Sequence, residues 1–380
     1  MRVGFVLEQC LSPVPGGTGR YSRELAGALA RTAPAGAEVR GVTAAHRARV
    51  NLPGVAERRL PMPRRALVAA WERGAHPRVP GDIVHAPTPL APMRGRQPLV
   101  VTVHDAVPWT HPDTLTPRGV AWHRAAVARA ALTADLLVVP TRAVADELAR
   151  HIAVAAPVQV VGEGVSRELA LPLDADERAT RLDLPERFLL TVATLEPRKG
   201  LAELVRVLAD PAAPRLPLLC VGQPGWGGQG GAALDVEALG ASLGVEVRLL
   251  GRVPDPDLAV LLHRATALVV PSRAEGFGLP LLEGMAAGTP VLTTDVAALV
   301  EVAGGAALHA PLHALLDGLV SVVTDNGLRA RLCEAGPIRA AAYSWEGAAR
   351  TLWQAYAALV AAGPVGRCAE AARRRLDSSS

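Results

Sequence analysis

Two glutamates, Glu275 and Glu283, lie eight positions apart on either side of the segment G-F-G-L-P. An apolar run typical of a strand precedes Glu275, and the pattern from Pro280 to Gly288 is typical of a helix. Free amides at the start of such a helix, together with its dipole, form an anion site suited to a diphosphate. Two carboxylates around that site suit a ligand with hydroxyl groups at both ends and a diphosphate between them.

Each glutamate also has an ordinary structural interpretation. We expect Glu283 in the first turn of the helix, where the helix dipole favours acidic side chains whether or not a ligand binds. Glu275 equally fits an acidic loop residue. The spacing alone does not decide between the structural and the functional interpretation.

A basic pair, Arg198 and Lys199, follows a second strand-like run in the segment A-T-L-E-P-R-K-G-L. Cations are disfavoured at a helix start, yet Lys199 is the only lysine among the 40 lysine and arginine residues. At a strand end the two charges can converge on phosphate oxygens, arginine as a fork and lysine as a point charge. We therefore expect the pair to stabilise a leaving diphosphate.

The composition excludes several classes of protein. The chain has 380 residues, half of them hydrophobic, which is too many for one ordinary core and predicts two domains. A net charge of +4 and 3% aromatic residues argue against a nucleic-acid partner. The four cysteines lack C-x-x-C spacing, which argues against a zinc site or a disulfide framework and favours a cytoplasmic location. There is no signal-peptide pattern and no apolar run of about 18 residues.

Strand-like runs alternate with helical patterns in two series. This alternation predicts an α/β fold of two Rossmann-like parallel-sheet lobes that face each other across a cleft, with ligands at the C-terminal ends of the strands. We expect an N-terminal lobe over residues 1–165, a linker rich in proline and charged residues over 166–186, and a C-terminal lobe over 187–342. A crossover helix over 343–362 and a disordered basic tail over 363–380 are expected to follow.

The pairing of L-E-P-R-K-G-L with S-R-A-E-G-F-G-L-P-L-L-E-G-M-A-A-G-T-P-V-L resembles the retaining glycosyltransferases of family 4 (group 1), which have the GT-B fold. The resemblance extends from G-G-T-G-R-Y-S-R-E-L through V-T-V-H-D to Y-S-W-E-G-A-A-R-T-L-W-Q-A-Y, nearly the whole chain. Within the family the chain is most similar to bacterial mannosyl- and rhamnosyltransferases. It departs from the family at 162–166, which read G-E-G-V-S where many members read P-N-G-V-D.

The resemblance implies a retaining, metal-independent enzyme of cell-surface polysaccharide or glycolipid synthesis. It would move mannose or a similar hexose or deoxyhexose from a nucleotide sugar to a hydroxyl of a saccharide or lipid-linked acceptor. GDP-mannose is the favoured donor, a UDP- or dTDP-sugar is the alternative, and no cofactor is implied. Residues 187–342 would bind the donor and 1–165 would form the acceptor side.

The resemblance also implies roles for individual residues. Glu275 would contact the sugar hydroxyls and stabilise positive charge on the ring, and Glu283 would hold the ribose hydroxyls. Arg198 and Lys199 would bind the diphosphate, and His104 would face the sugar or acceptor, so that Glu275, His104, Arg198 and Lys199 form the catalytic set. The other implied donor contacts are Gly16, Gly17, Arg252, Val253, Gly276, Phe277, Gly278 and Leu279.

The spacing of Gly17, Gly19 and Ser22 approaches G-x-G-x-x-G, the dinucleotide fingerprint. However, seven residues separate the first strand from Gly17, and Glu38 begins the next strand instead of ending it. We therefore expect no NAD site. Gly16 and Gly17 are interpreted as a mobile loop at the start of a helix from about Tyr21, where the backbone can approach a ligand.

Three other patterns have structural explanations. The pairs Asp174/Asp176 and Asp255/Asp257 are spaced like metal ligands, but we expect them to cap backbone amides. The glycine-rich segment 222–231 lacks the Gly-Lys-Ser/Thr ending of a P-loop and is expected to be a flexible loop. The arginines of 47–78 allow peripheral contact with the inner face of the plasma membrane, although a solvated face is the simpler interpretation.

Two other function classes stay open at this point. One is a sugar-nucleotide epimerase of the same fold, and the other is a non-catalytic relative that serves as a binding subunit. The basic pair and the two glutamates favour a transferase over both.

Overall fold

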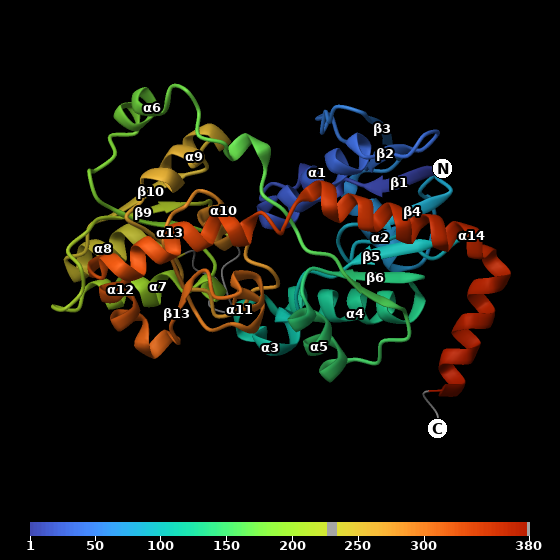
Figure 1. The fold of residues 1–380 in the computed structure, drawn as a ribbon. Helices are drawn as coiled ribbons and strands as arrows, with labels where there is room; N and C mark the ends of the chain where they lie inside the picture. The colour runs from blue at the N-terminus through green and yellow to red at the C-terminus, as the bar shows by residue number, and fades with distance from the viewer. Residues whose placement is uncertain (226–233, 378–380) are drawn as a thin grey trace. The chain divides into compact units, whose positions relative to one another are not determined.

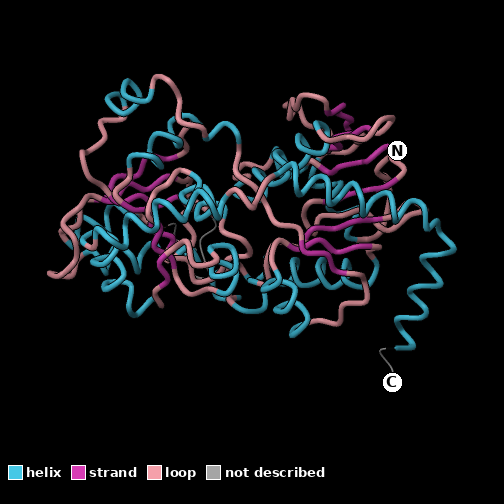
Figure 2. Tube along the Cα trace, viewed as in Figure 1, coloured by secondary structure: helices cyan, strands magenta, loops and turns pink. Residues whose placement is uncertain are grey.

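The computed structural model describes residues 1–225 and 234–377. The chain folds into two compact units (Figure 1). The first unit comprises residues 1–109, 119–163 and 344–380, and the second comprises 110–118 and 164–343. In each unit helices surround a parallel sheet (Figure 2).

The first unit contains a seven-stranded parallel sheet in the order β3-β2-β1-β4-β5-β6-β7. Its strands are β1 (Arg2–Val6), β2 (Glu38–Thr43), β3 (Val55–Arg59), β4 (Ile83–Ala86), β5 (Leu99–Thr102), β6 (Leu136–Val139) and β7 (Val158–Val160). The same part of the chain contains the helices η1 (Glu8–Leu11), α1 (Gly16–Arg31), α2 (Arg64–Glu72), α3 (Val107–Thr110), η2 (Pro112–Thr114), α4 (Pro117–Thr133) and α5 (Arg142–His151). Of these, η2, the last residue of α3 and the start of α4 belong to the second unit.

The second unit contains a six-stranded parallel sheet in the order β10-β9-β8-β11-β12-β13. Its strands are β8 (Leu189–Val192), β9 (Leu218–Val221), β10 (Val247–Gly251), β11 (Ala267–Val270), β12 (Val291–Thr293) and β13 (Leu308–His309). Its helices are η3 (Arg167–Leu169), α6 (Ala175–Arg181), η4 (Pro197–Lys199), α7 (Leu201–Leu208), α8 (Val236–Leu243), α9 (Asp255–Arg264), α10 (Leu279–Ala286), α11 (Ala297–Ala303), η5 (Leu312–Ala314), α12 (Leu315–Thr324) and α13 (Asn326–Ala340).

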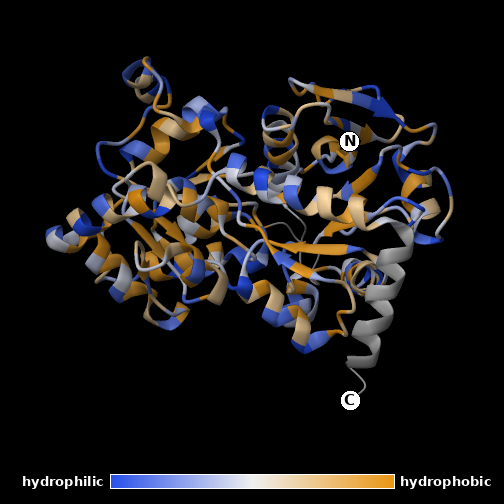
Figure 3. Ribbon diagram, turned by 45° about the vertical axis from the view of Figure 1, so that its right-hand side comes forward, coloured by the Kyte–Doolittle hydropathy of each residue, from blue (hydrophilic) through white to orange (hydrophobic). Residues whose placement is uncertain are grey.

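The central strands explain why the sequence folds in this way. All four residues of β5, β6, β9 and β11 are buried, as expected for parallel strands that are covered on both faces. These strands are coloured as hydrophobic in Figure 3, whereas the edge strand β3 is polar and mostly exposed. The predicted pair of parallel-sheet α/β lobes is therefore confirmed.

The C-terminal helix α14 (Trp345–Asp377) belongs to the first unit. It packs beside α1, where the Trp353 Nε1–H donates to the carbonyl oxygen of Leu29 at 3.1 Å. The Tyr356 hydroxyl is hydrogen-bonded to His85 Nδ1 in β4 at 2.5 Å. Aromatic side chains of this helix thus anchor the end of the chain in the core formed by its beginning.

The expected crossover helix over 343–362 corresponds to the first part of α14. Gly363, with φ 59° and ψ 178°, is not helical and bends the element. The predicted basic tail of 363–380 begins at this bend. Its last residues, 378–380, lie outside the described part of the chain, and so does much of the expected glycine-rich loop of 222–231, at 226–233.

The segment 166–186, expected as a linker, contains η3 and α6 and belongs to the second unit. The Arg178 guanidinium in α6 donates to Asp257 Oδ1 in α9 and to Asp174 Oδ1, both at 2.7 Å. The side chain of Asp174 makes no capping bond, and Asp257 also accepts from Arg181 at 2.8 Å. Asp174 and Asp257 are therefore ion-pair partners instead of the expected caps.

The start of α1 corrects the interpretation of the glycines. Gly16 and Gly17 are the first residues of this helix, which begins five residues before the expected Tyr21. Gly16 has a φ of +59°, which is available to glycine without strain and turns the chain into the helix from Pro15. The two glycines form the first turn of a helix and not a loop.

Candidate active site

The second unit positions its charged residues at the point where the strand order reverses. Strands β8 and β11 are neighbours, and β9 and β12 continue the sheet on either side of them. Open α/β sheets bind ligands outside the carboxyl ends of strands at such a switch point. Arg198 and Lys199 follow β8, and Glu275 follows β11. The topology thus brings both predicted motifs to the same edge of one sheet.

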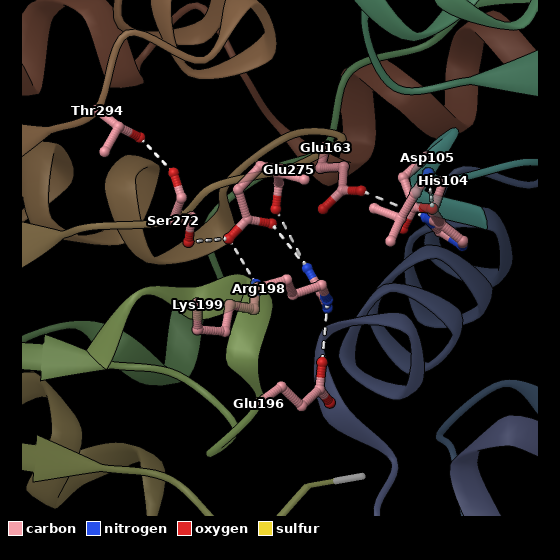
Figure 4. A network of polar contacts seen from close by, with 11 residues as sticks. His104, Asp105, Glu163, Glu196, Arg198, Lys199, Ser272, Glu275 and Thr294 are labelled. Carbon is pink, nitrogen blue, oxygen red and sulfur yellow. Dashed lines mark hydrogen bonds and ion pairs between the residues drawn. The ribbon is translucent and has the colours of Figure 1, made fainter. Parts of the chain in front are cut away.

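The charged side chains of these two stretches are in contact (Figure 4). The Lys199 ammonium donates to Glu275 Oε1 at 2.5 Å, and Arg198 Nη1 lies 3.6 Å from Glu275 Oε2. The Ser272 hydroxyl donates to the same Oε1 at 2.8 Å. The side chain of Glu275 is 9% exposed and that of Lys199 is 12% exposed. Glu275 is therefore a mostly desolvated carboxylate held between two cations.

The backbone that carries these side chains is itself bonded across the two stretches. The Arg273 N–H donates to the carbonyl oxygen of Arg198 at 2.8 Å. Gly200, which ends the turn η4, has a φ of +66°, and a Cβ there would lie 2.0 Å from the carbonyl oxygen of Pro271. Only glycine allows this approach, which fixes the basic pair against the end of β11.

Burial and charge act in opposite directions on Glu275. Burial alone would raise the pKa of its carboxyl, but the charges of Lys199 and Arg198 outweigh it and hold that pKa below the usual 4.5. Burial, reinforced by Arg198, lowers the pKa of the Lys199 ammonium from its usual 10.5. The carboxylate is therefore ionised at neutral pH, and the cluster carries two positive charges against one negative charge before Glu196 is counted.

Three further residues belong to the network, and none was singled out from the sequence. Glu196 Oε2 accepts from Arg198 Nε at 2.9 Å, Ser272 binds Glu275, and the Thr294 hydroxyl after β12 donates to the carbonyl oxygen of Ser272 at 2.5 Å. Glu196 and Ser272 lie within three residues of predicted site residues, which is a usable signal. Thr294 has no such signal, because only the pairing of β11 with β12 brings it near.

The segment after Glu275 forms the expected turn and helix. Gly278, with a φ of +91°, precedes α10, and Pro280 lies in its first turn. The phenyl ring of Phe277 packs edge-on against Tyr343, with 5.4 Å between centroids. The expectation that Glu283 lies in the first turn of the helix is wrong, because α10 begins at Leu279 and no acidic residue lies in its first turn. Glu283 is the fifth helical residue and is buried.

The other implied contacts of the donor lie on the same sheet. Arg252 and Val253 follow the edge strand β10, with β9 between that strand and β8. Arg252 is exposed and Val253 is half-buried. Gly276 follows Glu275 directly in the turn before α10.

The first unit contains the remaining predicted residues. His104 follows β5, and its Nε2 is hydrogen-bonded to the carbonyl oxygen of Pro87 at 2.8 Å. Its Nδ1 lies 3.8 Å from Glu163 Oε1, a partner that the sequence did not suggest. Asp105 Oδ1 accepts from the backbone N–H of Val107 at 3.0 Å, and so it shapes the turn after the strand.

Two features are absent from the described residues. These residues contain no group of three or more His, Cys, Asp or Glu side chains arranged to hold a metal ion. Within 1–225 and 234–377, no helix is long and apolar enough to cross a membrane.

The chain matches two families of known sequences. Residues 15–169 match Glycosyltransferase Family 4, and residues 174–339 match Glycosyl transferases group 1. D-inositol 3-phosphate glycosyltransferase 1 of Catenulispora acidiphila is 32% identical over 316 residues, which are 75% of each chain. O-antigen chain mannosyltransferase B of Escherichia coli is 34% identical over 175 residues, 44% of this chain and 45% of that protein. The chain thus spans about half the length of the Escherichia coli protein.

Solved structures with a similar fold cover nearly the whole chain. Sucrose-phosphate synthase from Thermosynechococcus elongatus superimposes with a TM-score of 0.77 and 22% identity, over 96% of this chain and 100% of that one. Anabaena Alr3699/HepE in complex with UDP-glucose gives a TM-score of 0.71 and 18% identity, over 94% and 100%. At these identities the similarity establishes a shared fold.

Proposed function

We propose a specific reaction for this chain, which belongs to the family 4 (group 1) glycosyltransferases and has the GT-B fold. The chain moves mannose, or a similar hexose or deoxyhexose, from a nucleoside diphosphate sugar to an acceptor hydroxyl with retention of the anomeric configuration. The observation that carries the proposal is the cluster of Arg198, Lys199 and Glu275 at the switch point of the second sheet.

The two cations suit a leaving diphosphate. Arg198 and Lys199 are largely desolvated and held in place by the Gly200 turn, so they stabilise new negative charge more strongly than solvated cations do. When the bond from the anomeric carbon to the phosphate oxygen breaks, its electron pair goes to that oxygen. The new negative charge can then pair with Arg198 and Lys199 in competition with Glu196 and Glu275.

Glu275 can stabilise the sugar, which is the other partner of the bond that breaks. The sugar ring gains positive charge as the diphosphate leaves, and an ionised carboxylate beside it lowers the energy of that state. The acceptor hydroxyl attacks from the face on which the phosphate departs, and the phosphate oxygen takes its proton. No protein base is required, and the configuration is retained.

The remaining contacts with the substrates come from the turn before α10, from α10 itself, from the end of β10 and from the first unit. The amides of Gly276, Phe277, Gly278 and Leu279 face the diphosphate and sugar, Glu283 binds the ribose hydroxyls, and the backbone at Arg252 and Val253 meets the base. With Gly278 at a φ of +91°, the backbone reaches the ligand without a side chain. In the first unit His104, Gly16 and Gly17 contact the substrates.

The identities of the donor and acceptor rest on the relatives. GDP-mannose is favoured by the similarity to an O-antigen chain mannosyltransferase, and a UDP-sugar is the alternative supported by the fold shared with a UDP-glucose complex. The acceptor is a saccharide or a lipid-linked saccharide of polysaccharide or glycolipid synthesis.

We assign the reaction to the cytoplasm, with peripheral membrane contact through the arginines of the first unit. It needs no metal, because Arg198 and Lys199 neutralise the diphosphate.

The test is an assay of the full chain with GDP-, UDP- and dTDP-sugars and candidate saccharide acceptors. Nucleotide release and the anomeric configuration of the product are measured for the wild type, Lys199→Ala and Glu275→Ala. Arg206→Ala is the matched control, because this arginine is exposed on α7 near the basic pair in sequence. The proposal is supported if Lys199→Ala and Glu275→Ala lose transfer while Arg206→Ala retains it. An inverted product, or full activity in both variants, contradicts it.

The same assay distinguishes the alternatives. A sugar-nucleotide epimerase would release an altered nucleotide sugar without an acceptor. A binding subunit would retain the nucleotide sugar and turn over none of it.

A further inference from the structure

The first unit contains a buried acid beside His104 (Figure 4). The Nε2 of His104 lies 2.8 Å from the carbonyl oxygen of Pro87. A carbonyl oxygen can only accept, so Nε2 carries a hydrogen. The nitrogen of this ring that titrates is therefore Nδ1. It faces Glu163 Oε1 at 3.8 Å.

The distance between Nδ1 and Oε1 has two consequences. It is short enough for a strong charge interaction, since the side chains of His104 and Glu163 are only 14% and 5% exposed. It is too long for a direct hydrogen bond. An Nδ1–H stabilised by Glu163 can therefore still donate to the oxygen of a ligand.

The other groups that face the imidazole do not oppose a positive charge. Tyr21 of α1 packs edge-on at 4.6 Å between centroids, and burial raises the pKa of its hydroxyl, so it is neutral. Burial lowers the pKa of His85 in β4 to about 3, so it is neutral as well. Asp105 on the same strand end adds negative charge.

The balance of these effects favours the cation. Burial alone would lower the pKa of His104, but Glu163, the Pro87 carbonyl and Asp105 outweigh it and raise that pKa above 6.5. Glu163 lies in G-E-G-V-S, the stretch in which this chain departs from the family's P-N-G-V-D. An amide at this position would carry no charge to stabilise an imidazolium.

We propose that Glu163 is a positioning residue that holds His104 doubly protonated, so that Nδ1–H donates to a hydroxyl oxygen of the transferred sugar or the acceptor. This inference rests on the proposed function, because the ligand is a substrate of that reaction. It adds a residue that acts through His104 and a protonation state that the reaction requires.

The first test does not depend on activity. The histidine signals of the full chain are titrated by NMR, and the His104 signal is assigned by its loss in His104→Gln. Glu163→Gln is expected to move the His104 titration to lower pH. Glu147→Gln is the matched control, because Glu147 Oε1 pairs with the exposed His151 Nε2 at 2.9 Å in the same unit, and it should leave His104 unchanged. An unchanged His104 titration in Glu163→Gln would overturn the proposal.

The second test uses sugar transfer. The loss of kcat/KM on the alkaline side is expected to begin at lower pH in Glu163→Gln, while activity at acidic pH is retained and Glu163→Asp restores the wild-type profile. If the NMR titration moves but the rate profile does not, the role of Nδ1–H toward substrate is wrong. If the wild type transfers no sugar, the proposed function fails while the NMR result stands. Should Glu163→Gln not fold, Glu163→Asn repeats both measurements.

Discussion

Lys199 and Glu275 lie 76 positions apart in the chain, and their side chains meet at 2.5 Å in a mostly buried ion pair. Each charge is the principal partner of the other, and Arg198 stands 3.6 Å away as a second cation. A bound diphosphate would compete with Glu275 for both cations and leave the carboxylate to the sugar.

Removing one charge of the pair should reduce both activity and stability. We expect Glu275→Gln to lower kcat by about 10²–10³-fold, as for the loss of one transition-state contact. It should also lower the free energy of unfolding by up to about 3–5 kcal/mol, because Lys199 loses its partner while buried. Steady-state kinetics and urea denaturation measure the two effects. In the double variant Lys199→Met/Glu275→Gln stability should return but activity should not; recovery of activity would contradict the catalytic role.

Glu275 should also make stability depend on pH. Its pKa is depressed in the folded state, so its contribution to stability is present above the usual 4.5 and is lost as pH falls through the folded value. The free energy of unfolding, measured from neutral pH downward, should therefore fall more steeply in the wild type than in Glu275→Gln. Parallel curves would show that the ion pair adds no stability.

Gly200 should not tolerate a side chain. Gly200→Ala combines left-handed strain with a Cβ 2.0 Å from the Pro271 carbonyl, and we expect a loss of about 2–5 kcal/mol in urea denaturation. Gly244→Ala is the control, because its φ of +71° is similar but nothing lies within 4 Å of its Cβ. It should cost only about 1–2 kcal/mol. Equal losses would mean that the close approach to Pro271 is unimportant.

Glu283 should act on donor binding more than on the chemical step. We expect Glu283→Ala to raise the KM for the nucleotide sugar with a small change in kcat, since the hydrogen bonds that we propose from Glu283 to the ribose are the same in the ground and transition states. Glu334→Ala, an exposed acid on α13, is the control for a lost negative charge. A selective fall in kcat would place Glu283 at the reacting bond instead.

Metal removal should leave the reaction unchanged. In the proposed reaction the charges of Arg198 and Lys199 replace a divalent ion at the diphosphate, so turnover in EDTA should equal turnover in saturating Mg²⁺. Restoration of a lost activity by Mg²⁺ alone would contradict this assignment.

The sequence determined the local elements and the chemistry they carry. Apolar runs alternating with helical patterns predicted two parallel sheets, and the strands of β5, β6, β9 and β11 are buried throughout. Pro280 and Gly288 marked the ends of one helix, because their backbone preferences act within a few residues. Both charged motifs were visible for the same reason: their residues are close in the chain.

The tertiary structure decided which of these residues meet. Strand order places β8 beside β11, and this neighbourhood pairs Lys199 with Glu275. Likewise Glu163 reaches His104 only because their strand ends lie on one edge of the first sheet. Hydrophobic periodicity reports which face of an element is buried and not which element lies next to it. The partners of the site therefore depended on contacts between distant parts of the chain.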